Sequence, residues 1–203
     1  MSEKGTLIKN LPNIVTILGL VGAIWLLVIT ITSPEQLGLI FVLAIIVSST
    51  DYLDGWLAKR LEGKSDVGAA LDRLRDKVFI VPTLIILTWY YKDKVTDLPI
   101  TGTLTEALVI VVVLIEALLF FTGLIGLFKK LGVESNPFGK KKMFFEFLVV
   151  IIWLASLTIE KYLGKIVPFS IYLIDLCLLL AAYYSVKSFE GYYQRYTTKA
   201  PEK

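Results

Sequence analysis

The chain has 203 residues, of which 56% are hydrophobic, and a mean hydropathy of +0.71, so it is more apolar than ordinary soluble domains. Its 21 basic and 18 acidic residues leave a formal charge of +3, which argues against a nucleic-acid-binding protein. The absence of histidine excludes a histidine nucleophile, a Ser–His pair and a His-ligated metal. The sequence therefore predicts a membrane protein in which carboxylates perform any acid–base or metal chemistry.

Six apolar runs are candidates for membrane-spanning helices, which need about 20 mostly apolar residues each. The first run has no small-residue cleavage site after it, so we expect it to be retained rather than removed as a signal peptide. The second and third runs are too short to cross a membrane unless their helices continue through neighbouring polar residues. The six runs are 14–31, 37–50, 78–91, 107–128, 143–159 and 166–186.

The basic residues indicate the orientation of these helices. With six spans both termini lie on one side, and that side holds all but four of the 21 basic residues, the exceptions being Lys92, Lys94, Lys161 and Lys165. Basic loops stay in the cytoplasm, so both termini and the loop between the second and third runs are expected there. Without an internal repeat, residues 1–203 are expected to form a single all-α multi-pass domain in the plasma (inner) membrane.

Four of the aspartates between the second and third apolar runs form two pairs. Asp51 and Asp54 are three residues apart and Asp72 and Asp76 are four apart, so each pair occupies one face of a helix. The segment 61–66, "LEGKSD", has a glycine and a Ser–Asp helix-start signal, so the chain can turn there and return antiparallel. The two pairs of carboxylates are then expected to face each other near the cytoplasmic boundary.

Such a cluster would repel itself at low dielectric unless cations neutralise it, and oxygen ligands suit Mg²⁺ or Mn²⁺. Two such ions can clamp a diphosphate and stabilise the charge that develops on its leaving group. Gly55 and Gly68 have no side chain and leave room for a substrate to approach the backbone. The sequence thus predicts a two-metal site.

Two other interpretations of the aspartates remain open. They could form a proton- or cation-transport site, as acids within a membrane often do. They could also form a solvated surface that pairs with nearby basic residues, although surface pairing requires neither the short apolar runs nor the glycines. The basic residues concerned are Lys59, Arg60, Arg73, Arg75 and Lys77.

The aspartate segment resembles the signature of the CDP-alcohol phosphatidyltransferase family, D-x2-D-G-x2-A-R-x8-G-x3-D-x3-D. Every spacing of that signature is kept, and one residue departs from it, since Lys59 stands where the family has arginine. Arg60 follows directly and can take the role of that arginine. The matching residues are Asp51, Asp54, Gly55, Ala58, Gly68, Asp72 and Asp76.

The resemblance implies a six-helix fold, usually homodimeric, that transfers a phosphatidyl group from CDP-diacylglycerol to an alcohol and releases CMP. By that likeness the four aspartates hold two divalent cations, Mg²⁺ or Mn²⁺, and Asp76 also takes the proton of the acceptor hydroxyl. The CDP-lipid would contact Asp54, Gly55, Ala58, Lys59 and Gly68. Membrane lipids would surround the apolar helix faces.

Two further segments resemble parts of the same family. "LPNIVTILG" is similar to the N-terminal juxtamembrane amphipathic entry of glycerophosphate-accepting members, where Asn13 would help to hold the nucleotide or would only cap a helix. "NPFGKKKMFFE" resembles the G-K-x-K-T segment of phosphatidylglycerophosphate synthases, with Met143 in place of threonine. Lys140 and Lys142 are expected to bind the phosphate of the acceptor, with Arg195 as a further ligand.

Glycerol 3-phosphate is therefore the expected acceptor, with phosphatidylglycerol phosphate as the product. Inositol phosphate, inositol, serine, choline, ethanolamine and phosphatidylglycerol remain alternatives, and the basic segment could instead contact anionic headgroups. Three acids in apolar helices have no place in the signature. Glu146 is expected to pair with the lysine segment, and Glu116 and Asp175 to hydrogen-bond between helices or in a dimer.

Overall fold

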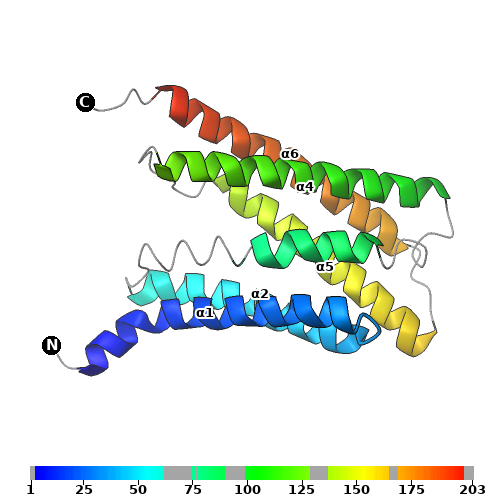
Figure 1. Cartoon of the computed structure of the whole chain (residues 1–203), viewed down its shortest axis with the longest axis horizontal. Helices are drawn as coiled ribbons and strands as arrows, with labels where there is room; N and C mark the ends of the chain where they lie inside the picture. The colour runs from blue at the N-terminus through cyan, green and yellow to red at the C-terminus, as the bar shows by residue number, and fades with distance from the viewer. Residues whose placement is uncertain are drawn as a thin grey trace. The chain divides into compact units, whose positions relative to one another are not determined.

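The structure is a computed structural model that describes residues 3–61, 75, 77–89, 99–128, 137–164 and 169–198. All regular structure in this part of the chain is helical, as the sequence predicts. Five helices are long, and a shorter apolar helix, Lys77–Trp89, lies between the second and the next (Figure 1). The long helices are α1 (Glu3–Thr32), α2 (Leu37–Leu61), α4 (Pro99–Phe128), α5 (Pro137–Leu163) and α6 (Phe169–Thr198).

The five long helices contain segments long and apolar enough to cross a membrane, so the prediction of a multi-pass membrane protein is confirmed. These segments are Leu11–Thr32, Leu37–Leu57, Thr103–Gly123, Pro137–Leu163 and Phe169–Gln194. The helix Lys77–Trp89 is shorter than the roughly 20 residues that a span requires. A sixth span and the cytoplasmic placement of both termini therefore stay predictions.

Helix α2 extends beyond its apolar run, as expected from the shortness of that run. It continues from Leu37 to Leu61 and therefore includes the positions of Asp51 and Asp54 in its C-terminal part. In α1, Pro12 lies inside the helix, where it removes one backbone hydrogen bond and favours a bend. Figure 1 shows the first part of α1 turned away from the rest of the helix. The amphipathic juxtamembrane segment expected at the N-terminal end stays a prediction.

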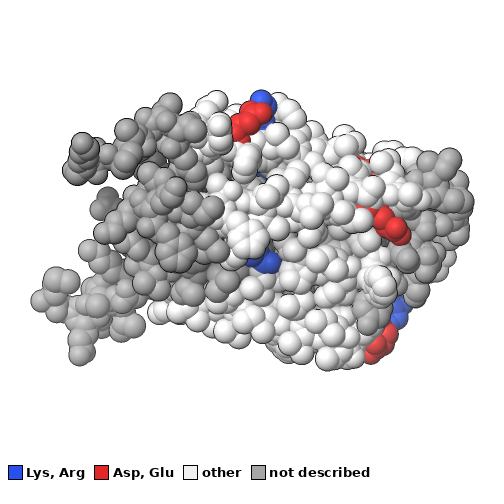
Figure 2. Space-filling model, turned by 45° about the horizontal axis from the view of Figure 1, so that its top comes forward, with Lys and Arg blue, Asp and Glu red and all other residues white. Residues whose placement is uncertain are grey.

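Large apolar side chains are exposed along the long helices. On α1 they include Leu18, Val21 and Trp25, each more than half exposed. Charged side chains are few among the described residues on the face shown in Figure 2. Because exposed apolar surface of this extent suits lipid rather than water, these faces fit contact with the bilayer.

The chain divides into two compact units. The first comprises Met1–Tyr90 and Leu154–Ile166, and the second Tyr91–Trp153 and Val167–Lys203. In the first unit α1 packs against α2, and Ala23 and Leu26 of α1 and Ile40 and Ala44 of α2 are fully buried. A single domain over residues 1–203 stays a prediction.

In the second unit α4 packs against α6. Val112 and Leu178 are fully buried there, and Cys177 is buried as well. The Thr105 hydroxyl on α4 donates a hydrogen bond of 2.6 Å to the Asp175 carboxylate on α6. The interhelical hydrogen bond expected of Asp175 is therefore confirmed, and it provides a partner for an acid inside an apolar helix.

Candidate active site

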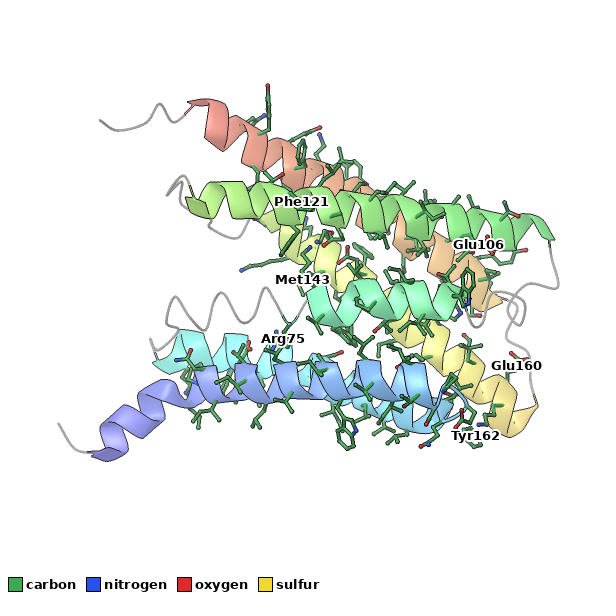
Figure 3. The ribbon with its side chains drawn as sticks, viewed as in Figure 1. Arg75, Glu106, Phe121, Met143, Glu160 and Tyr162 are labelled. Carbon is green, nitrogen blue, oxygen red and sulfur yellow. The ribbon has the colours of Figure 1, made fainter. Side chains whose placement is uncertain are left out.

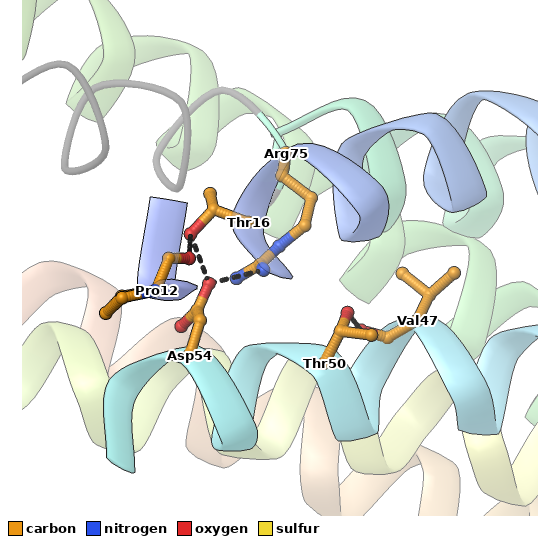
Figure 4. A network of polar contacts seen from close by, with 6 residues as sticks. All are labelled: Pro12, Thr16, Val47, Thr50, Asp54 and Arg75. Carbon is orange, nitrogen blue, oxygen red and sulfur yellow. Dashed lines mark hydrogen bonds and ion pairs between the residues drawn. The ribbon is translucent and has the colours of Figure 1, made fainter. Parts of the chain in front are cut away.

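Of the four aspartates of the signature, Asp54 is the one whose side chain the structure describes. This side chain is almost fully buried, with 1% of its surface exposed. Its Oδ2 atom accepts a hydrogen bond of 2.7 Å from the Thr16 hydroxyl of α1 (Figure 4). The same oxygen accepts a bond of 2.9 Å from Nη1 of Arg75, which is an ion pair. Arg75 is also 1% exposed, and it is itself helical, two residues before the helix Lys77–Trp89 (Figure 3). Three segments of the first unit therefore meet at one carboxylate.

The other carboxylate oxygen, Oδ1, is buried and accepts no hydrogen bond from the described part of the chain. A buried polar atom without a hydrogen-bond partner lowers the stability of the fold by about 1–3 kcal/mol, and by more when the group is charged. Such atoms therefore usually contact a protein group, a water molecule or an ion. A carboxylate oxygen suits a hard divalent cation. The open Oδ1 atom therefore fits the predicted Mg²⁺ or Mn²⁺ site.

The remaining predicted cation ligands contribute no described side chain. Asp51 lies one turn before Asp54 on α2, so its spacing on the helix face is as predicted, but its side chain is outside the described residues. Asp72, Asp76 and Gly68 lie wholly outside them. Within the described residues no group of three or more potential metal ligands is found. The two-metal site stays a prediction supported by Asp54.

The structure describes some of the residues that are predicted to bind the CDP-lipid. A Cβ atom added to Gly55 would meet no described atom within 4 Å, so the described residues leave space beside the backbone directly after Asp54. Asn13 is half-buried on α1, three residues before Thr16 and thus on the same helix face. The side chains of Ala58 and Lys59 lie outside the described residues. These roles stay predictions.

Arg60, expected as a substitute for the family arginine, is exposed. Its guanidinium carbon lies 5.1 Å from the centre of the Trp56 ring, a cation–π distance on the surface of α2. The buried guanidinium at Asp54 belongs instead to Arg75, for which the sequence suggests only a surface pairing with the aspartates. Its spacing could have indicated otherwise, because positions three and four after Asp72 share the helix face that carries Asp76.

The second unit has its own buried charge cluster around Lys142, which is 6% exposed. Its ammonium group donates a hydrogen bond to Glu116 of α4 and lies 3.7 Å from Glu146, one turn further along α5. The pairing expected of Glu146 is therefore confirmed, and the interhelical contact expected of Glu116 is an ion pair. The acceptor-phosphate role of Lys142 stays a prediction, and two carboxylates compete for its ammonium group.

Lys140 differs from Lys142 in being exposed. Together with Lys141, Phe144, Phe145 and Tyr184 it lines an open surface hollow of about 380 Å³ on α5 and α6. The Lys141 ammonium lies 5.5 Å from the centre of the Tyr184 ring. Lys140 can therefore reach a soluble anion, whereas the side chain of Arg195 lies outside the described residues.

Comparison with known proteins identifies the family. The model of the CDP-alcohol phosphatidyltransferase family matches residues 9–183, which includes the whole aspartate segment. The chain belongs to this family. It is an enzyme family, and the resemblance of the aspartate segment to the family signature is confirmed.

Several curated relatives share a name within the family. The CDP-diacylglycerol–glycerol-3-phosphate 3-phosphatidyltransferase of Cereibacter sphaeroides is 34% identical over 83 residues, or 40% of this chain and 38% of the relative. Its namesake in Salmonella choleraesuis is 29% identical over 105 residues, or 50% and 56%. The cardiolipin synthase (CMP-forming) of Streptomyces coelicolor is 33% identical over 86 residues, or 40% of each. The chain thus spans about two fifths to just over half of these relatives.

Proposed function

We propose that the protein transfers a phosphatidyl group from CDP-diacylglycerol to glycerol 3-phosphate, giving phosphatidylglycerol phosphate and CMP at the cytoplasmic membrane surface. The observation that carries this proposal is the buried Asp54 carboxylate within the family signature, with Oδ2 held by Thr16 and Arg75 and Oδ1 open. Support for the acceptor comes from relatives whose names include glycerol 3-phosphate.

In the proposed reaction Asp76 takes the proton of the acceptor hydroxyl, and the resulting oxygen attacks the β-phosphorus of CDP-diacylglycerol. A bond forms between that oxygen and phosphorus, and the bond from phosphorus to the bridging oxygen breaks, so that the electron pair leaves with CMP. Two divalent cations held by Asp51, Asp54, Asp72 and Asp76 would supply stabilisation of negative charge on the diphosphate. The open space beside Gly55 would admit the cytidine.

Lys140 is proposed to bind the phosphate of glycerol 3-phosphate, because it is exposed at the start of α5. Backbone N–H groups at a helix N-terminus also favour an anion. Arg195 is proposed as a second ligand. Asn13 and Lys59 would help to bind the CDP-lipid. We further expect a homodimer, by the family resemblance.

CMP release by the purified, detergent-solubilised protein tests this function. We expect release from CDP-diacylglycerol that requires glycerol 3-phosphate and Mg²⁺ or Mn²⁺, and that stops when EDTA removes the cation. Phosphatidylglycerol is included as an acceptor because one relative is a cardiolipin synthase. Release with phosphatidylglycerol but not with glycerol 3-phosphate would replace the acceptor and keep the aspartate chemistry. Cation-dependent transport in liposomes without CMP release would favour a transporter.

Asp76→Asn tests the proton acceptor. An asparagine cannot take a proton from the acceptor hydroxyl, so we expect turnover to be abolished while CDP-lipid binding is largely retained. Single-turnover CMP release and equilibrium binding of CDP-diacylglycerol provide the two measurements. Near-wild-type turnover of this variant would show that another group is the base.

A further inference from the structure

Two donors share one oxygen of Asp54. The Thr16 hydroxyl and Nη1 of Arg75 both bind Oδ2, at 2.7 and 2.9 Å, while Oδ1 is buried and receives no hydrogen bond from the described residues (Figure 4). Hydrogen bonds to one oxygen fix the rotation of the carboxylate plane and therefore the direction of the other oxygen. The two donors thus determine where Oδ1 points.

Arg75 has room beside α1 because position 19 is a glycine. A Cβ atom at Gly19 would lie 3.1 Å from both Cδ and Nη1 of Arg75 and 2.6 Å from the Thr50 hydroxyl. A side chain there would have to displace Thr50, and the Arg75 side chain would have to shift by a few tenths of an ångström. Gly19 therefore forms the slot in which Arg75 reaches Asp54.

The stability of the protein alone gives little reason for such a pair. A buried ion pair is often no more stable than apolar residues of the same volume, so its presence suits a role in fixing geometry. Arginine suits this role because its guanidinium is planar, stays charged and donates in fixed directions. The signature expects an arginine at position 59, where this chain has lysine. Arg60, the next residue, is exposed over Trp56.

We infer that Arg75 and Thr16 are positioning residues that hold Oδ2 of Asp54 and direct Oδ1 to a divalent cation, with Gly19 leaving the space that Arg75 needs. This inference rests on the proposed function, because it assumes a cation at Asp54. Partners that orient metal-binding carboxylates typically affect metal affinity by about 10- to 100-fold.

Mn²⁺ titration of the full-length protein in detergent tests the inference, with free Mn²⁺ measured by its electron paramagnetic resonance spectrum. The variants Thr16→Val, Arg75→Lys and Gly19→Ala keep the net charge, so changes in affinity report geometry rather than Coulomb attraction. We expect each to weaken Mn²⁺ binding about tenfold. Thr16→Ser, which restores the hydroxyl, is expected to bind Mn²⁺ as the wild type does.

Thr30→Val is the matched control. Like Thr16, Thr30 is a buried threonine of α1 whose hydroxyl lies within hydrogen-bond distance of the backbone carbonyl four residues earlier, at 2.7 Å from Leu26 O for Thr30 and 3.0 Å from Pro12 O for Thr16. It should retain wild-type affinity, and thermal unfolding of all variants identifies any that fail to fold. If one does, the other substitutions still decide the question.

The outcomes separate this inference from the proposed function. Wild-type protein that releases CMP and binds Mn²⁺, with unchanged affinity in Thr16→Val and Arg75→Lys, would overturn the positioning role alone. Equal weakening by Thr30→Val would also overturn it, because the effect would then be general to buried threonines of α1. Wild-type protein that neither binds Mn²⁺ nor releases CMP would overturn both.

Discussion

Asp54→Asn is expected to lower CMP release by at least about 1,000-fold, equivalent to about 4 kcal/mol of transition-state stabilisation. The amide has nearly the shape of the carboxylate and can still accept a hydrogen bond from Thr16 at the position of Oδ2. It has no negative charge for a cation at the position of Oδ1. The loss should therefore persist at saturating CDP-diacylglycerol and glycerol 3-phosphate, as a decrease in kcat.

The same substitution leaves the Arg75 guanidinium buried without its negative partner. Breaking a buried ion pair from one side costs about 3–5 kcal/mol, so a lower temperature of thermal unfolding is expected as well. The double variant Asp54→Asn/Arg75→Met removes both charges and should recover most of this stability, while activity stays absent. If the double variant recovered turnover together with stability, Asp54 would be a structural residue and no cation ligand.

The position of Asp54 on a helix could be predicted from the sequence. An apolar run of about 14 residues cannot cross a membrane, so α2 had to continue through polar residues to Leu61. The three-residue spacing then puts Asp51 and Asp54 on one face. The length of an apolar run and the spacing of residues on a helix are local properties, so both can be determined from a single sequence.

The contacts of Asp54 could not be predicted in the same way, because spacing can place Arg75 on the helix face of Asp76 but cannot pair it, or Thr16, with Asp54. Thr16 is 38 residues away from Asp54 in sequence and Arg75 is 21 residues away, and nothing in the helical pattern of α1 indicates which α2 residue it faces. The burial of a side chain is equally hard to predict from the sequence, since Lys140 and Lys142 occupy equivalent positions in the motif. One is exposed and the other pairs with Glu116, 26 residues away on another helix. Contacts between helices depend on how the helices pack, and the pattern of apolar residues in a single sequence does not determine that packing.

Lys142→Met is expected to destabilise the protein strongly, because Glu116 and Glu146 would remain buried without the ammonium group between them. By the cost of breaking a buried ion pair, the free energy of unfolding should fall by about 3–5 kcal/mol. Lys140→Met is the matched comparison on the same helix, and its side chain is exposed. It should leave thermal unfolding unchanged and raise KM for glycerol 3-phosphate about tenfold or more, by loss of one charged hydrogen bond.

The triple variant Lys142→Met/Glu116→Gln/Glu146→Gln distinguishes the two roles of Lys142. It removes all three buried charges, so stability should return towards that of the wild type, and KM for glycerol 3-phosphate then reports whether Lys142 also binds the acceptor. A wild-type KM would assign Lys142 to the cluster that joins α4 to α5 and leave Lys140 as the phosphate ligand. A raised KM in the stable triple variant would instead mean that Lys142 leaves its two glutamates to bind phosphate. Thermal unfolding and steady-state CMP release on the same samples provide both quantities.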